Sequence, residues 1–387
     1  MNEVIDSQYQ RYHRLAQMGA LLAGEQHLPR LYDLIVSEAM ALANARMGTI
    51  LLREGDTLTP IATRTEVSID PESMRSFSRE RFPLQRESLG GQVLLEDKIL
   101  NLADIRTLPE GSPAILWPEF AHFKAYEFRS LLALPLKTPQ SGYMGVLVLL
   151  NALDTFGDAG AFEPQIEDMM TMVSTQFALA IQNVRWTRQL HQAYQDTLYR
   201  LSLVAKYRED PSGAQIRRVS HYSGLLASAL GLPEDKVEKI RVASALYDIG
   251  KLGIPEAILL KPGRLTPEEF ERMKQHTTVG AVILGGSQTE ILQIAERIAV
   301  GHHEKFDGTG YPYGQSGMEI PIEGRIVAVA EVFDALTTAR PYKQPMSFEK
   351  AVDTIREEAG KHFDPAVVQA FLGIQSEFEK TLQVIKV

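Results

Sequence analysis

Residues 302–312 have the sequence HHEKFDGTGYP, which puts two adjacent imidazoles directly before a glycine-rich loop. The same half of the chain carries a third imidazole at His276 and carboxylates at Asp248 and Glu331. Imidazoles together with carboxylates suit iron, manganese or zinc. The spacing alone is a weak signal, because adjacent side chains diverge on a helix. A pair of packed, hydrogen-bonded histidines is the simpler alternative.

The composition limits the kinds of site that the chain can build. It has 387 residues, of which 44% are hydrophobic and 23% charged, enough for two or three folded domains. It has no cysteine, so disulfides and thiolate zinc sites are excluded and nitrogen and oxygen atoms must hold any metal. The net charge of −9 argues against broad nucleic-acid binding. The polar amino terminus, MNEVIDSQYQ, and the lack of a long apolar run predict a cytoplasmic protein that does not bind membranes.

The first part of the chain predicts helices and hairpins. Residues 1–26, and a segment that begins at Pro29, space their apolar side chains as helices do. Two pairs of apolar runs follow, and a polar turn separates the members of each pair. The runs are residues 49–53 and 58–61, and residues 131–136 and 143–150. Helices beside hairpins favour an α+β domain with an antiparallel sheet.

Residues 165–207 predict one long linker helix. Its apolar side chains recur at alternating steps of four and three residues. They are Ile166, Met170, Val173, Phe177, Ala180, Val184, Tyr194, Leu198 and Leu201. A repeat of about 3.5 residues makes a stripe that pairs best with a second helix, so we expect a parallel homodimer. The alternative is a helix whose stripe packs on its own domains.

Beyond the linker the chain predicts helices with clear boundaries. Pro233 precedes one helix, which we expect to end at Gly250. Thr266-Pro267-Glu268-Glu269 combines a capping box with a first-turn proline, on the helix that we expect to carry His276. Asp364-Pro365 starts another helix in the same way. The predicted organisation is an N-terminal helix (1–26), an α+β domain (27–164), the linker helix (165–207) and an all-α domain (208–387).

Further motifs accompany the opening stretch. They are Tyr247-Asp248-Ile249-Gly250-Lys251, Lys261-Pro262-Gly263, Met273-Lys274-Gln275-His276 and Arg340-Pro341-Tyr342-Lys343. With these motifs, residues 200–375 closely resemble an HD-GYP domain. The resemblance implies a helical, metal-dependent phosphodiesterase that hydrolyses cyclic di-GMP. It also implies a site of two or three metal ions, usually iron or manganese.

The resemblance implies roles for individual residues. Asp248 bridges two metal ions, and His276, His302 and His303 complete the coordination of one of them. Lys251 faces the scissile phosphate. Two metals about 3.5–4 Å apart clamp the attacking and leaving oxygens of such a reaction. The residues implied to contact the nucleotide are Gly310, Tyr311, Arg340 and Lys343.

Four positions depart from the pattern of that family. Tyr247 replaces the histidine that gives the family its name, and Glu331 replaces a metal-ligating aspartate. Pro211 and Gln215 stand where a glutamate and a histidine are implied on the first helix. A phenol must lose a proton with a pKa of about 10 to bind a metal, and an amide is a weak donor. We therefore expect one metal ion, iron or manganese, to be held firmly and a second site to be degenerate.

The first half resembles a GAF domain, a small sensory fold. The features that carry this resemblance are residues 28–43, the strand from Thr49, Ser88-Leu89-Gly90-Gly91-Gln92-Val93, Leu131-Leu132-Ala133-Leu134-Pro135-Leu136 and residues 175–183. GAF domains bind cyclic nucleotides, haem, bilins or metabolites, or only a partner. The lack of cysteine excludes a thioether-linked bilin, and the sequence leaves open which other small ligand, if any, binds here.

Two functions remain open at this point. In the first, a GAF sensor controls a degenerate HD-GYP domain that binds cyclic di-GMP with little or no hydrolysis. In the second, the chain is an active cyclic di-GMP phosphodiesterase that uses altered metal ligands. A dimeric scaffold that binds no nucleotide is a third possibility.

Overall fold

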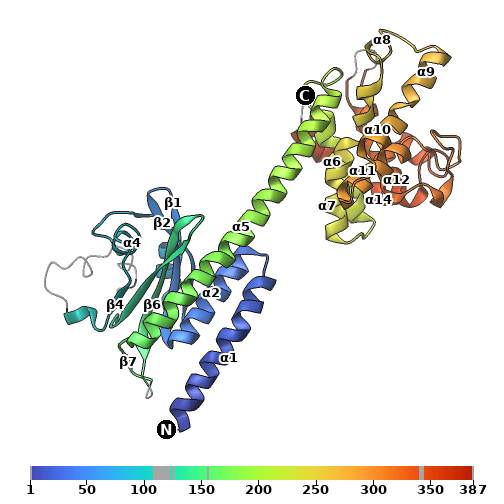
Figure 1. Cartoon of the computed structure of the whole chain (residues 1–387). Helices are drawn as coiled ribbons and strands as arrows, with labels where there is room; N and C mark the ends of the chain where they lie inside the picture. Colours follow the sequence, from blue (N-terminus) through green and yellow to red (C-terminus); the bar gives the residue numbers. More distant parts are fainter. Residues whose placement is uncertain (1, 108–122, 124–126, 155–156, 340–343, 386–387) are drawn as a thin grey trace. The chain divides into compact units, whose positions relative to one another are not determined.

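The computed structural model describes residues 2–107, 123, 127–154, 157–339 and 344–385. It contains two compact units, Met1–Leu190 and His191–Val387, which are described separately (Figure 1). None of the described helices is long and apolar enough to cross a membrane.

The first unit is built around one antiparallel sheet. Its strands are β1 (Ala45–Glu54), β2 (Thr57–Thr65), β3 (Phe82–Pro83), β4 (Leu100–Leu102), β5 (Leu131–Thr138), β6 (Gly142–Leu153) and β7 (Ala159–Gly160). Its helices are α1 (Asn2–Gly24), α2 (Leu28–Ala43), α3 (Pro71–Arg79), α4 (Leu89–Leu94), η1 (Ile105–Thr107) and the first part of α5 (Pro164–Lys206). The strand order is β3-β2-β1-β6-β5-β4, with β7 beside β6. Both predicted hairpins, β1–β2 and β5–β6, are confirmed.

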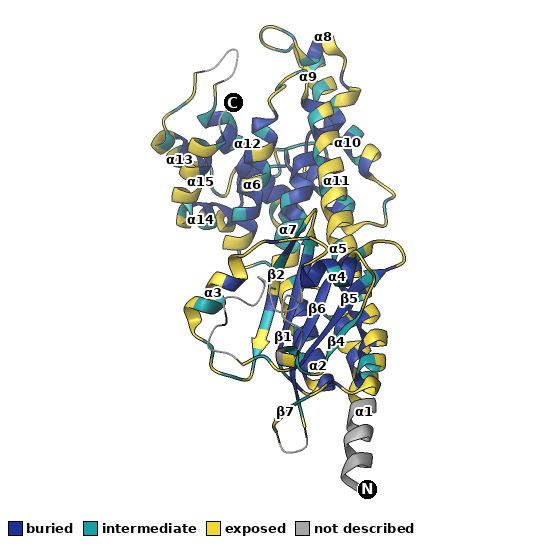
Figure 2. Ribbon diagram, turned by 90° about the vertical axis from the view of Figure 1, so that its left-hand side faces the viewer, coloured by how far each residue is buried: buried dark blue, intermediate teal, exposed yellow. Residues whose placement is uncertain are grey.

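Side chains alternate between the two faces of this sheet, as a period of two residues requires. Ile50 and Leu147 belong to the core on the face covered by α1, α2 and α5 (Figure 1). Leu51 and Val148 point to the other face and pack with Phe77 of α3. The central strands are buried from both sides (Figure 2).

The apolar stripe of α5 packs within its own chain rather than forming a free seam. Ile166, Met170, Val173 and Phe177 are buried in the core of the first unit, and Leu198 is buried in the core of the second. The alternative stated for this helix therefore describes these five residues, whereas Leu201 of the same stripe is 50% exposed. Dimerisation through α5 stays a prediction.

The second unit is all helical. Its helices after α5 are α6 (Ala214–Ala229), α7 (Glu234–Ala243), η4 (Ser244–Leu246), η5 (Ile249–Gly253), α8 (Glu256–Leu259), α9 (Pro267–Lys274), α10 (His276–Leu284), α11 (Glu290–Gly301), η6 (Gly317–Glu319), α12 (Ile322–Thr337), α13 (Phe348–Glu357), α14 (Pro365–Gly373) and α15 (Gln375–Val384). The predicted fold class, an α+β domain followed by a long helix and an all-α domain, is confirmed. The capping box at Thr266 is present, with Glu269 N bonded to Thr266 Oγ1 and Thr266 N to Glu269 Oε2.

Two predicted helix boundaries are wrong. The helix after Pro233 ends at Ala243, and the chain continues as the short turns η4 and η5. Ser244 Oγ donates to the carbonyl of Arg241 and so competes with the helical backbone at that point. His276 does not lie on the helix capped at Thr266 but begins α10. Asp248 consequently lies in an irregular segment between η4 and η5, which frees its side chain from the direction that a helix would impose.

Candidate metal centre

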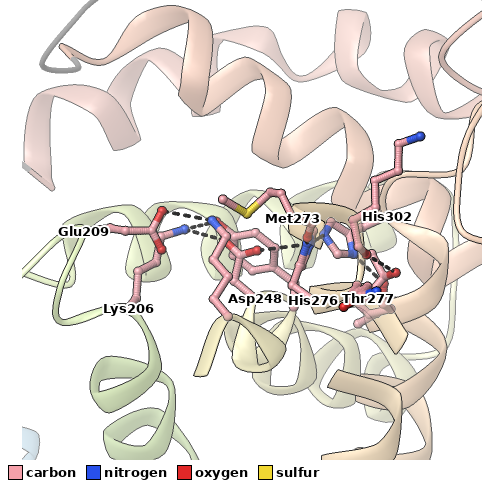
Figure 3. A network of polar contacts seen from close by, with 12 residues as sticks. Lys206, Glu209, Asp248, Met273, His276, Thr277 and His302 are labelled. Atoms are coloured by element: carbon pink, nitrogen blue, oxygen red, sulfur yellow. Dashed lines mark hydrogen bonds and ion pairs between the residues drawn. The ribbon is translucent and has the colours of Figure 1, made fainter. Parts of the chain in front are cut away.

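Three segments of the second unit converge on one cluster of side chains (Figure 3). Asp248 precedes η5, His276 begins α10, and His302 and His303 follow α11 directly. Gly250 makes the convergence possible, because a Cβ at this position would lie 1.9 Å from the carbonyl oxygen of His276. Only a glycine lets η5 approach α10 this closely, and the approach brings Asp248 to the histidines.

The three imidazoles are arranged as metal ligands are. One nitrogen each of His276, His302 and His303 lies within 4.8 Å of the others. His276 Nδ1 lies 2.7 Å from the Met273 carbonyl oxygen, and His302 Nδ1 lies 2.9 Å from that of Ile298. A carbonyl oxygen only accepts hydrogen bonds, so both Nδ1 atoms carry the hydrogen. This is how ligating histidines are usually oriented.

The two remaining nitrogens then face each other with lone pairs. His276 Nε2 and His302 Nε2 are 3.4 Å apart and both rings are 1% exposed. Two buried lone pairs at this distance repel each other unless a cation lies between them. The arrangement therefore fits a bound metal ion better than a pair of packed histidines.

Burial keeps two of the imidazoles, those of His276 and His303, neutral. It lowers the pKa of His276 to about 4, although the charge of Asp248 opposes the shift. Burial, with the neighbouring His302 and His276, holds the pKa of His303 well below its usual range. Neutral imidazole is the form that binds metal, so the cluster is ready to coordinate an ion at neutral pH.

One oxygen of Asp248 is directed toward this cluster. Asp248 is 4% exposed, and its Oδ1 lies 3.6 Å from His276 Nε2. Oδ1 has no hydrogen-bond partner among the described residues. A buried carboxylate oxygen without a partner is costly, and coordination of a metal would satisfy it. Three imidazoles and one carboxylate oxygen thus fit a single divalent ion.

The other oxygen of Asp248 is already engaged by two ammonium groups. Lys206 Nζ lies 2.8 Å and Lys251 Nζ 2.9 Å from Oδ2. Lys251 Nζ also lies 3.0 Å from Glu209 Oε2. Although burial alone would raise the pKa of Asp248, the two lysines hold it well below its usual range. Burial likewise opposes the charge of Lys251, but Asp248 and Glu209 raise its pKa.

Lys206 was not among the residues that the sequence singled out. It is the last residue of α5, its side chain is 3% exposed, and it also donates a hydrogen bond to the Tyr247 hydroxyl. A lysine near the end of a long, mostly polar helix is normally a solvated residue, so no signal in the sequence marked it. Glu209 was missed for the same reason.

Tyr247 fills the core beside the metal cluster. Its side chain is fully buried, and its ring meets the His302 ring edge-on at 5.4 Å. Burial and the charges of Asp248 and Glu331 raise its pKa well above the usual value. In the metal-free chain the phenol is therefore neutral. Glu331, on α12, is close enough for its pKa to be raised by burial and by the charge of Asp248.

The loop after the histidine pair folds back on its own backbone. A Cβ at Gly310 would lie 2.3 Å from Lys305 N, so the close approach that requires this glycine is made within the loop. Tyr311 N bonds to the His303 carbonyl at 3.2 Å, and the Tyr311 ring stacks on His303 at 4.8 Å. Lys274 Nζ lies 5.5 Å from the centre of the Tyr311 ring. The loop thus gives the metal cluster an aromatic wall with a cation beside it.

The remaining predicted residues lie elsewhere. Pro211 lies in an exposed turn between α5 and α6 rather than on a helix, so the position assumed for it is wrong. Gln215 lies in the first turn of α6, and its backbone N–H bonds to Asp210 Oδ2. Arg340 and Lys343, implied to bind the nucleotide, lie outside the described residues.

Comparison with known proteins identifies both halves of the chain. A model of the GAF domain family matches residues 27–181, and a model of the HD domain family matches residues 201–367. A cyclic di-GMP phosphodiesterase from Thermotoga maritima is 48% identical over 188 residues, which are 48% of this chain and 51% of that protein. The cyclic di-GMP phosphodiesterase response regulator RpfG from Xanthomonas campestris is 45% identical over 48% of this chain and 49% of its own length.

The shared region does not extend over whole relatives. The chain spans about half the length of the curated relatives it matches first. A 3'3'-cGAMP-specific phosphodiesterase 2 from Vibrio cholerae is 39% identical over 52% of this chain and 38% of that protein. The activities in these names belong to those proteins.

Solved structures resemble the first half. The GAF domain of an Acinetobacter phosphoenolpyruvate-protein phosphotransferase aligns with 46% of this chain and 95% of its own, at 18% identity and a TM-score of 0.34. The two family matches agree with the antiparallel sheet of the first unit and with the all-helical second unit. The chain consists of a GAF domain followed by an HD domain.

Proposed function

We propose that this chain is a cyclic di-GMP receptor, in which a GAF domain controls an HD domain that holds one divalent metal ion and hydrolyses the nucleotide slowly or not at all. The observation that carries the proposal is that the two carboxylate oxygens of Asp248 have different surroundings. Its Oδ1 faces the imidazoles without a hydrogen-bond partner in the described structure, whereas two ammonium groups engage Oδ2. A carboxylate in this state can bind one metal ion but cannot bridge two.

The metal proposed for this site is iron or manganese. Three imidazoles and a carboxylate oxygen, without any thiolate, suit either ion. When bound, the ion would supply positive charge to a phosphate. Hydrolysis of a phosphodiester by two metal ions requires both the attacking and the leaving oxygen to be clamped. A single ion with the neutral Tyr247 beside it supports binding more than cleavage.

Cyclic di-GMP is proposed as the ligand because two of the relatives named above carry it in their names. The site offers suitable chemistry, since Lys251 and Lys274 supply positive charge and Tyr311 supplies an aromatic face. We assign Lys251 to the scissile phosphate. The remaining proposed nucleotide contacts are Gly310, Tyr311, Arg340 and Lys343.

Calorimetry with the full chain, loaded with Mn²⁺, tests the proposal. We expect cyclic di-GMP to bind and to be recovered intact by chromatography after prolonged incubation, with 3'3'-cGAMP as a second probe. His302→Ala should abolish binding, whereas His362→Ala, outside the cluster, should not. Steady production of linear dinucleotide or GMP would contradict the receptor function.

The alternative is an active phosphodiesterase with altered ligands. Glu331 favours it, because a carboxylate is retained close to Asp248. In that case iron or manganese would support multiple turnovers in the same assay, and Glu331→Gln would reduce the rate while leaving nucleotide binding largely intact.

Control by the GAF domain is proposed to pass through α5. Residues 187–193 of this helix are exposed, so an insertion there leaves both cores intact. Five inserted residues rotate one part of the helix against the other by about 140°, whereas seven bring it back to within about 20°, because a turn takes about 3.6 residues. We expect the five-residue insertion to change the affinity for cyclic di-GMP and the seven-residue insertion to preserve it.

The chain is also proposed to be a homodimer. Met172, Leu179 and Trp186 of α5 are exposed and seven residues apart, a spacing typical of helices that pair. Sedimentation of the wild-type chain and of Leu179→Glu tests this, since the charge should convert dimers to monomers. A monomeric wild-type chain would overturn the assignment.

A further inference from the structure

We infer that the ammonium group of Lys206 takes the place of a second metal ion at Asp248 and so limits the centre to one ion. The inference rests on the one-metal centre of the proposed function and names the residue that produces it. Nothing in the sequence indicated that Lys206 lies at the metal centre.

The first support is the burial of the charge. Lys206 is 3% exposed, although lysine is almost never buried unless it is paired. Its Nζ lies 2.8 Å from Asp248 Oδ2 and donates to the Tyr247 hydroxyl. A buried, hydrogen-bonded ion pair of this kind holds its geometry, because moving Lys206 away from Asp248 would leave a buried ammonium group without its carboxylate.

The second support is the oxygen that Lys206 contacts. Asp248 Oδ1 points toward the imidazoles, at 3.6 Å from His276 Nε2, so Oδ2 is the oxygen left for any second ion. A metal binds a carboxylate oxygen at about 2.0–2.2 Å. With ammonium nitrogens at 2.8 and 2.9 Å from Oδ2, an incoming ion would meet two positive charges at close range.

The third support is the set of groups around the ammonium. Asp248 and Tyr247 contact Lys206 directly, and Glu331 interacts with its charge. The carboxylates of Asp248 and Glu331 are oxygen groups of the kind that surround a hard cation. Lys206 therefore supplies from α5 the positive charge that these oxygens would otherwise attract from solution.

Two substitutions of Lys206 test separate consequences of this inference, the affinity for Mn²⁺ and the number of ions bound. Lys206→Met removes the positive charge and keeps the length of the side chain, so less of the negative charge of Asp248 is neutralised and Mn²⁺ should bind the histidine cluster at least about tenfold more tightly. Lys206→Glu adds a carboxylate to those of Asp248 and Glu331. It should raise the number of bound Mn²⁺ ions per chain from one to two.

The experiment uses the full chain with Mn²⁺ alone, without nucleotide. Stoichiometry is measured by equilibrium dialysis with elemental analysis, affinity by calorimetry, and folding by circular dichroism. Lys350→Glu is the control, because this exposed residue changes the net charge as Lys206→Glu does but lies on α13; it should keep one ion and wild-type affinity.

Two results would overturn the inference. One is a folded Lys206→Met chain with wild-type affinity for Mn²⁺, and the other is a folded Lys206→Glu chain that still binds one ion. If Lys206→Glu does not fold, the Lys206→Met affinity decides. These readouts involve no nucleotide, so failure here is distinct from failure of the receptor function, which depends on cyclic di-GMP binding without turnover.

Discussion

Arg218 and Asp334 form a two-point ion pair inside the helical unit, with Nε 2.5 Å from Oδ1 and Nη2 3.2 Å from Oδ2. Both side chains are buried, and the pair joins α6 to α12, the helix that carries Glu331. Removing Arg218 takes a two-point charged partner away from the buried carboxylate of Asp334. We expect Arg218→Met to lower the free energy of unfolding of this unit by about 3–5 kcal/mol.

Denaturant unfolding followed by circular dichroism measures this loss. Arg200→Met provides the control, since the Arg200–Asp196 pair is exposed and its removal should have little effect. Asp334→Leu combined with Arg218→Met should recover part of the stability. Equal effects of Arg218→Met and Arg200→Met would contradict the assigned role of the buried pair.

His302 is expected to be essential for metal binding. Its Nε2 faces that of His276, so His302→Ala removes one of the converging ligands. Mutation of residues that only contact the metal ligands usually weakens metal binding by about 10–100-fold. Loss of a directly bonded ligand should have a larger effect, so we expect Mn²⁺ to bind at least about 100-fold more weakly. Calorimetry with Mn²⁺ measures this, and unchanged affinity in the variant would exclude the histidine cluster as the metal site.

The stability of the metal-free chain should depend on pH through His276. Its pKa is lowered to about 4 in the folded protein, from 6.5, so between these values the unfolded chain binds more protons. Stability is therefore fully present above about pH 6.5 and falls as the pH is lowered toward 4, by at most about 3 kcal/mol for this residue. Thermal unfolding in chelator, from pH 7 to 4.5, measures the slope.

His276→Gln is the matched variant for this experiment, because glutamine does not titrate. Its stability should fall less steeply over the same pH range. Parallel slopes for the two chains would show that His276 is already protonated in the folded state or is not buried as described.

Glu304 is expected to hold the loop that carries Tyr311. It is 2% exposed, and its Oε1 accepts a hydrogen bond from Tyr313 N at 2.7 Å. Glu304→Ala leaves this backbone group without its partner, so limited proteolysis within residues 306–316 should become faster and cyclic di-GMP should bind more weakly. Glu304→Gln retains an acceptor oxygen and should resemble the wild type. Equal protease resistance in all three chains would contradict the role.

Restoring the family's ligands should not by itself restore hydrolysis. The pair Tyr247→His with Gln215→His leaves the Lys206 ammonium on Asp248 Oδ2, so we expect it to remain inactive. Addition of Lys206→Glu removes that charge and should produce measurable hydrolysis of cyclic di-GMP with Mn²⁺. Activity in the double variant would show that Lys206 does not prevent the second ion from binding.

Much of the fold followed from local patterns. The turn at Glu54 and Thr57, and the turn at Thr138 and Gly142, join strands whose apolar residues fit a sheet, and both hairpins form as predicted. The capping box at Thr266 also forms, because caps depend on residues within one turn. The end of the helix after Pro233 was misplaced, since a serine hydroxyl and tertiary packing end it before the glycine that the sequence offers.

The stripe on α5 shows where local patterns are ambiguous. The repeat through Phe177 and Leu198 fits either a second helix or the chain's own domains, because both bury the same side chains. Nothing in the sequence distinguishes pairing with a second helix from packing on the chain's own domains. Packing within each unit buries Phe177 and Leu198, whereas Met172, Leu179 and Trp186 of the same helix are exposed.

The sequence by itself determined the order of the two domains, the helix caps and hairpins, and the imidazoles and carboxylate available to a metal. These depend on residue type and on spacing within one element. The tertiary structure decided which oxygen of Asp248 meets the imidazoles and which meets Lys206, a residue 42 positions away along the chain. Whether a charge is solvated or buried against another depends on the packing of distant segments, and that packing turned a lysine at a helix end into part of the centre.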